Sequence, residues 1–262
     1  MPRGVAVTAA LAALRHRCRH DRKPVLRPSE TQHHTHNHRN TTTAAMPLEL
    51  RPMTPADVPA FALVAHDALS QAGMGLACHS RVAHPAYLAH RARRVEAALA
   101  NPRATMLKVV DTDDGDRLVA GAHWEALEAG RDAAALAALR EPYAVIPEEE
   151  ARHGDAQRDF FGWLYNARAR IVGKTPHYIL HLLVTHPSHQ GRGAGSLLLR
   201  WGFARADAAG LPVYIEATAA GLPVYAKAGF ETLESHTFDL AKYGLEGTDT
   251  HTVMVRRART EG

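Results

Sequence analysis

A glycine-rich turn between an apolar run and a helical pattern constrains this chain more than any other feature. The run from Tyr178 to Val184 is short and rich in branched and aromatic residues, which predicts a strand. Pro187 cannot donate a ladder hydrogen bond, so it ends that strand. Beyond the turn, apolar residues repeat at helical spacing at Leu197, Trp201, Ala204 and Ala208. The chain therefore places a strand, a tight turn and a helix start in immediate succession.

The turn itself has the properties of an anion site. Gly191, Gly193 and Gly195 leave several backbone N–H groups unobstructed at the mouth of the following helix. The positive end of the helix dipole points to the same place, so a phosphate or pyrophosphate can bind there. This combination indicates a nucleotide-like cofactor.

Two familiar phosphate-binding motifs do not fit the turn. A P-loop is excluded because no Gly-Lys-Ser/Thr closes the loop. A dinucleotide fingerprint needs its glycines directly after the strand, whereas the residues Thr185 to Gln190 intervene here and the last position holds Ser196. Glu216 lies at a suitable distance for that fingerprint, but the repeated strand–helix units of such a fold are missing.

Two sequence blocks resemble those of the GCN5-related N-acetyltransferase (GNAT) superfamily. Gln190, Gly193 and Gly195 match the pattern Gln-x-x-Gly-x-Gly/Ala, which is similar to the acyl-CoA pyrophosphate loop of that superfamily. Downstream, Glu216-Ala217-Thr218 ends an apolar run, and Tyr225 and then Gly229-Phe230 follow in the order and spacing of the family pattern. The resemblance covers roughly residues 48–257.

The resemblance implies an α/β (α+β) fold built on a mixed, mostly antiparallel sheet flanked by helices. Its central strands are expected to splay apart after a bulge near Leu183, which opens the acyl-CoA site. Acetyl-CoA is the implied cosubstrate, with its pantetheine arm against the strand backbone and its pyrophosphate on the turn. The implied cofactor-binding residues are Leu183, Val184, Thr185, Gln190, Gly191, Arg192, Gly193, Ala194 and Gly195.

The implied reaction is direct attack of a primary amine on the thioester carbonyl. Tyr225 is the expected acid for the departing thiolate, since a phenol can donate to sulfur. The alternative for Tyr225 is a packing role beneath the CoA arm. His181, on the strand before the turn, is the expected base and resembles a histidine of the arylalkylamine acetyltransferase branch. A structural histidine within the core is the alternative for His181.

The expected function is therefore an N-acetyltransferase that acts on the primary amine of a small molecule. A protein or peptide N-acetyltransferase and a non-catalytic acyl-CoA sensor are the alternatives. Tyr225 and His181 together favour an enzyme, because binding alone needs neither. A zinc site formed by His177, His181, His186 and His189 is not expected, because Pro187 interrupts the strand alternation and no cysteine joins the set.

The remaining pattern predicts a compact domain after residue 46. Strands are expected at residues 47–51, 104–111, 117–124, 211–218, 230–240 and 250–257, and helices at 54–69, 85–99, 157–172 and from about 197 to 208. The loop between the first two helices carries His79, Arg81 and His84 as possible acceptor contacts. Residues 126–157 are expected to form an insertion near the acceptor side, helical around 132–139.

Residues 1–45 differ in composition from the rest of the chain. They hold eight of the 31 Lys and Arg residues but two of the 27 acidic ones. Their polar, histidine-rich tract predicts a disordered tail, a mitochondrial presequence, or a segment preceding the true initiator Met46. The domain 46–262 then carries a formal charge of −2, which gives no charge argument for nucleic-acid binding.

Two further compositional features concern the compartment. No run approaches the eighteen or so apolar residues of a membrane span. Cys18 and Cys78 are too few for a disulfide framework and fit a reducing compartment. The expected location is cytoplasmic, or mitochondrial if residues 1–45 form a presequence.

Overall fold

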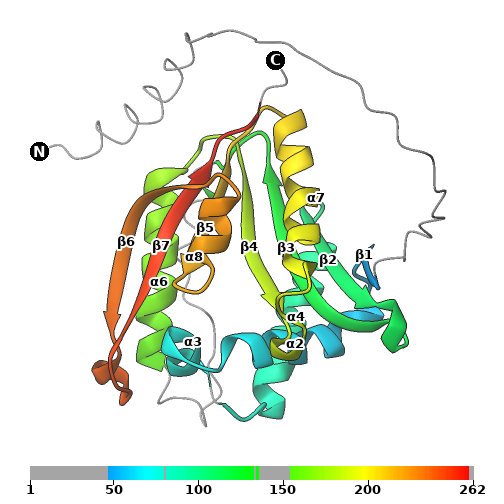
Figure 1. Ribbon diagram of the computed structural model, residues 1–262. Helices are drawn as coiled ribbons and strands as arrows, with labels where there is room; N and C mark the ends of the chain where they lie inside the picture. Colours follow the sequence, from blue (N-terminus) through cyan, green and yellow to red (C-terminus); the bar gives the residue numbers. More distant parts are fainter. Residues whose placement is uncertain (1–46, 80, 133, 136–153, 260–262) are drawn as a thin grey trace, which may run out of the picture. The chain divides into compact units, whose positions relative to one another are not determined.

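The computed structural model describes residues 47–79, 81–132, 134–135 and 154–259. In these residues seven strands form one sheet in the order β1-β2-β3-β4-β5-β7-β6 (Figure 1). Every neighbouring pair is antiparallel except β4 and β5. The strands are β1 (Leu48–Pro52), β2 (Ala104–Asp111), β3 (Arg117–Leu127), β4 (His177–Thr185), β5 (Val213–Thr218), β6 (Glu231–Asp239) and β7 (Thr248–Arg256). The α-helices are α2 (Val58–Leu69), α3 (Gly73–Cys78), α4 (Pro85–Ala100), α6 (Gly154–Ile171), α7 (Ala194–Ala208) and α8 (Leu222–Lys227).

The expected mixed, mostly antiparallel sheet is confirmed, and most element boundaries agree to within a few residues. The start of the first helix is a capping box in which Asp57 accepts from the backbone N–H and the hydroxyl of Thr54. One element was not expected. The loop after α2 contains the short helix α3, whose Met74 N–H donates to Asp249 of β7 at 2.7 Å.

Helices cover both faces of the sheet. On one face α7 and α8 contribute Leu198, Leu199 and Tyr225 to a core that includes Trp124 of β3 and Ile215 of β5. The other face is covered by α2, α4 and α6 through two further clusters, one around Phe61 and one around Ile171. Burial of these apolar surfaces is the main favourable term that holds the layers together.

The helix α7 presents a glycine, Gly202, to the Trp124 ring of β3. A Cβ atom added to Gly202 would come within 2.3 Å of the Trp124 ring. The Trp124 indole N–H also donates to the Leu198 carbonyl of the same helix at 3.3 Å. The small residue Gly202 and the large residue Trp124 therefore set how α7 packs against β3.

A bulge and an interrupted pairing open the middle of the sheet. His123 pairs with Leu182 and Trp124 with Leu180, so the extra residue of β4 is His181. Beside it, β4 pairs with β5 only at Tyr178–Val213 and Ile179–Tyr214. No pairing with β5 follows Ile179, and Figure 1 shows the two strands β4 and β5 diverging. The splay is confirmed, but the bulge lies two residues before the position expected near Leu183.

The boundaries of the expected insertion differ from the observed ones. The strand β3 continues to Leu127, and α6 begins at Gly154, three residues before the expected start. Most of the interval between them, including most of the helix expected at 132–139, lies outside the described residues, as does the segment 1–46. No helix in the described part is long and apolar enough to cross a membrane.

Candidate active site

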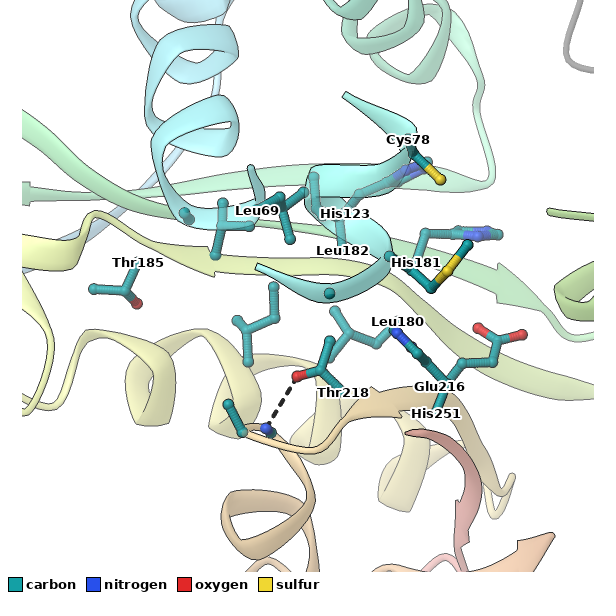
Figure 2. Close-up of a pocket in the computed structure, with 18 of the residues that line it drawn as sticks. Leu69, Cys78, His123, Leu180, His181, Leu182, Thr185, Glu216, Thr218 and His251 are labelled. Atoms are coloured by element: carbon teal, nitrogen blue, oxygen red, sulfur yellow. Dashed lines mark hydrogen bonds between the residues drawn. The ribbon is translucent and has the colours of Figure 1, made fainter. Parts of the chain in front are cut away.

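A cavity of about 1020 Å³ occupies the space where β4 and β5 separate. Figure 2 shows His181 and Leu182 of β4 together with Glu216 and Thr218 of β5 around this space. The cavity reaches the turn before α7 at one end and the helices α3, α4 and α6 at the other. One continuous space therefore joins the predicted cofactor loop to the predicted acceptor side.

The glycine turn lines the first end of the cavity. Gly191 and Gly193 have φ values of +76° and +90°, and a Cβ added at either would meet no atom within 4 Å. The first helical bond of α7 runs from Leu197 N–H to the Gly193 carbonyl, so the preceding amides have no partner within the helix. Left-handed glycines and free amides together leave room for an anion to approach the backbone.

Most of the predicted cofactor residues line this cavity, and Arg192 does not. The lining includes Leu183, Val184, Thr185, Gln190, Gly191, Gly193, Ala194 and Gly195. The Arg192 guanidinium instead donates to Asp111 of β2 at 2.5 Å and to His189 at 2.7 Å. The hydrogen bond from Arg192 holds the pKa of the Asp111 carboxyl below its usual value. In this structure the charge of Arg192 is therefore directed to a strand and not to the cavity.

Tyr225 reaches the cavity from α8. Its side chain is buried against Phe230, with the two ring centroids 5.7 Å apart. Burial raises the pKa of Tyr225 to about 12. The phenol is therefore protonated at neutral pH and able to donate a hydrogen bond.

His181 lines the cavity and is paired with a carboxylate of the neighbouring strand. Its Nε2 lies 2.9 Å from Oε2 of Glu125 on β3, and its side chain is 18% exposed. Burial lowers the pKa of His181 to about 4, because desolvation outweighs the attraction of Glu125. At neutral pH the ring is therefore uncharged.

Several charged residues of the cavity were missed by the sequence analysis. Arg168 of α6 makes a bidentate pair with Glu216, with nitrogen–oxygen distances of 2.6 and 2.8 Å. Asp249 of β7 pairs with His251 at 3.1 Å, and both line the cavity. Glu125 and Glu216 are each a single acidic residue within an apolar strand, which was the available signal. Arg168 and His181, their partners at 2.6 and 2.9 Å, come from segments 48 and 56 residues away and left no local pattern.

The acceptor end also contains aromatic and histidine side chains. Phe160 and Phe161 line it, whereas Trp163 packs against Phe238 and His236. His79 lines the cavity as well, while the ring of His84 caps α4 by accepting from Ala86 N–H. In the described residues no group of three or more His, Cys, Asp or Glu side chains is placed to hold a metal ion.

The comparison with protein families agrees with this geometry. A family model described as an acetyltransferase (GNAT) domain matches residues 128–240, which include the glycine turn, Glu216 and Tyr225. The match covers under half of the chain and identifies this part of it as similar to a GNAT acetyltransferase domain. This match supports N-acetyltransferase activity. A search of curated proteins finds no match to this chain.

Solved structures share the GNAT fold with this chain at low identity. A mosquito arylalkylamine N-acetyltransferase (like 5b) is 15% identical with a TM-score of 0.58, covering 80% of this chain and 99% of that one. An apo agmatine N-acetyltransferase is 11% identical with a TM-score of 0.56, covering 80% and 99%. A Corynebacterium glutamicum protein described as histone acetyltransferase HPA2 and related acetyltransferase is 20% identical with a TM-score of 0.50, covering 82% and 99%. At these identities the likeness shows the fold.

Proposed function

We propose that this chain transfers an acetyl group from acetyl-CoA to the primary amine of a small molecule. The observation that carries the proposal is the continuity of the cavity, which joins the amides of the glycine turn to Tyr225, His181 and the acceptor end. A cofactor bound at the turn and an amine bound beneath α6 would then meet at the splay. Such positioning is a large part of what an enzyme contributes to a two-substrate reaction.

The cofactor is proposed to lie along β4. From Leu180 onward this strand has no pairing with β5, so an extended pantetheine arm could form backbone hydrogen bonds with it, chiefly from Leu183 to Thr185. The pyrophosphate would be bound by the free amides at the start of α7, with the stabilisation that a helix N-terminus gives to anions. The arm would then direct the thioester toward Tyr225 and His181.

In the proposed reaction the amine nitrogen forms a bond to the thioester carbon, and the carbon–sulfur bond then breaks. The proton released from nitrogen passes to His181, which is uncharged at neutral pH. The departing sulfur takes its proton from the Tyr225 hydroxyl. If His181 is only a core residue, its replacement would not affect proton transfer. The same holds for Tyr225 if it only packs against the cofactor.

A small acceptor is proposed because the acceptor end lies among the side chains of α3, α4 and α6, including Phe160 and Phe161. Two of the similar structures are named for small amines, arylalkylamines and agmatine. The acceptor itself is to be found by screening small amines and peptides while CoA release is followed.

The cofactor site is tested by calorimetry with CoA on the Gly193→Val variant. A branched side chain at φ +90° would project into the space proposed for the pyrophosphate, so CoA affinity should fall at least ~10-fold. The matched control is Gly244→Val, since Gly244 has φ +75°, equally open surroundings, and no part in lining the cavity. Equal CoA affinity in the two folded variants would contradict the assignment of the turn.

A further inference from the structure

Behind His181 lies a chain of buried polar side chains whose hydrogen bonds are mutually dependent. Glu125 Oε2 contacts both His181 Nε2, at 2.9 Å, and Arg131 Nη2, at 3.2 Å. Arg131 Nη1 in turn lies 3.2 Å from His177 Nε2, and His177 Nδ1 lies 2.6 Å from the Thr175 carbonyl. The side chains of Glu125 and Arg131 are 10% and 4% exposed, and His177 is fully buried.

The donors and acceptors in this series of hydrogen-bonded side chains allow only one arrangement of protons. A carbonyl oxygen only accepts, so His177 Nδ1 donates to Thr175 and its Nε2 is left to accept from Arg131. Arg131 is a donor at every nitrogen, and its second donor is directed to Glu125. Burial opposes ionisation of Glu125, but the hydrogen bond with His181 and the nearby positive charges lower the pKa of Glu125 to about 2. As a carboxylate it has no proton to give, so His181 Nε2 must be the donor.

This arrangement determines which atom of His181 is available for chemistry. With its proton on Nε2, the ring carries its lone pair on Nδ1. Among the residues that the structure describes, no side chain or backbone group hydrogen-bonds to that nitrogen, and the ring lines the cavity.

We propose that Glu125, held by Arg131 and His177, is a positioning residue that fixes the tautomer of His181, so that Nδ1 is the atom that accepts the proton of the attacking amine. The inference rests on the proposed function for its chemical step. The proton leaves the amine nitrogen and bonds to Nδ1, and the imidazolium that results is stabilised by the carboxylate already bound to Nε2–H. Glu125 itself remains ionised throughout and does not contact the amine.

The charges around His181 support this assignment. The negative group in direct contact is Glu125, while the positive groups and the second histidine surround the pair from β3, α4, α6 and the segment after β3. These are His123, whose ring centroid lies 4.6 Å from that of His181, and the guanidinium groups of Arg94, Arg131 and Arg168. Arg103, from the segment before β2, adds a further positive group, with its Nε 3.7 Å from Oε1 of Glu125. The positive charge of Arg168 is balanced by its pair with Glu216. Without Glu125, the charged groups around an imidazolium at His181 would be positive, except for Glu216, which is paired with Arg168. The imidazolium would then form less readily.

The experiment reads the His181 tautomer directly, by long-range ¹H–¹⁵N NMR correlation on the full chain at neutral pH. Wild type should show His181 protonated at Nε2 and unprotonated at Nδ1, as a single tautomer. In Glu125→Gln the amide can donate as well as accept, so the His181 signals should shift toward a mixture of tautomers. The control Glu234→Gln removes the carboxylate of an exposed pair with Arg170 and should leave the His181 signals unchanged.

A kinetic readout accompanies the spectrum once an acceptor is known. Glu125→Gln should lower kcat at least ~10-fold while the KM for acetyl-CoA stays within about twofold, and Glu125→Asp should recover part of the loss. A proton on Nδ1 of His181 in wild type would overturn the proposal whether or not the protein turns over. So would an unchanged tautomer together with unchanged kcat in Glu125→Gln. If that variant does not fold, the wild-type tautomer alone still tests the proposal. Arg131→Lys, which keeps the charge but loses the second donor to His177, then takes the place of Glu125→Gln.

Discussion

The buried ion pair between Arg168 and Glu216 offers a quantitative test of how the cavity wall is held. Both side chains are almost fully buried, at 8% and 5% exposed, and their two hydrogen bonds join α6 to β5. Burial opposes the charge of Arg168, yet the facing carboxylate keeps the pKa of Arg168 above its usual value. Glu216→Gln keeps the shape of the side chain but leaves this cation without its counter-charge.

The expected loss follows from this geometry. Removing one partner of a buried ion pair costs roughly 3–5 kcal/mol, because the other charge stays desolvated. The same helix provides a matched comparison in Arg170–Glu234, also bidentate, with exposures of 50% and 30%. An exposed pair contributes about 1 kcal/mol or less. Glu234→Gln should therefore lower the free energy of unfolding by about 1 kcal/mol or less, and Glu216→Gln by roughly 3–5 kcal/mol.

The assay is urea unfolding of the two variants beside wild type, followed by both circular dichroism and tryptophan fluorescence to check for a two-state transition. Equal free-energy losses in Glu216→Gln and Glu234→Gln would refute the reasoning. That outcome would mean that water reaches Arg168 in solution and that the cavity wall is not packed as described.

The remaining predictions concern packing and acid stability. Gly202→Ala places a Cβ within 2.3 Å of Trp124, so it should lower the free energy of unfolding in urea by about 1–3 kcal/mol. In Gly162→Ala of the helix α6 the added Cβ meets no atom within 4 Å, so the free energy of unfolding should rise by about 0.5–1 kcal/mol. Burial lowers the pKa of His177 to about 4, so the folded state binds no proton there while the unfolded chain binds one below about 6.5. The free energy of unfolding should therefore fall as pH decreases from about 6.5 to 4, and His177→Gln should reduce this slope by up to ~1.4 kcal/mol per pH unit. An unchanged slope in His177→Gln would show that His177 titrates normally.

The order of the elements and the cofactor end of the site were predictable because their signals are local. A short apolar strand, Pro187 and three glycines are adjacent in the sequence, and the structure has a strand, a turn and the start of α7 there. The helix start at Thr54 was predictable for the same reason, since its capping box spans four residues. Tyr225 was singled out because the block from Glu216 to Phe230 resembles the GNAT family pattern, and the structure places it on α8 after the strand that ends at Thr218.

The parts that escaped prediction depend on contacts between distant residues. The bulge at His181 is set by the register between β3 and β4, and β4 itself holds no glycine or proline that would mark it. The helix α3 is joined to the start of β7 by Asp249, 175 residues away from Met74. Glu125 was visible as a charge in an apolar strand, but His181 becomes its neighbour, and His177 the neighbour of Arg131, only when β3 and β4 pair.

The most direct test of the central proposal is the turnover of acetyl-CoA with a panel of small amines by wild type and Tyr225→Phe. The substitution keeps the ring and its contact with Phe230 and removes the hydroxyl alone. CoA affinity should be unchanged by calorimetry, and kcat should fall ~10²-fold or more at saturating amine, since the thiolate loses its proton donor. Full activity in Tyr225→Phe would contradict the role of the hydroxyl. Tight CoA binding by wild type without turnover of any amine or peptide would contradict the enzyme and favour an acyl-CoA sensor.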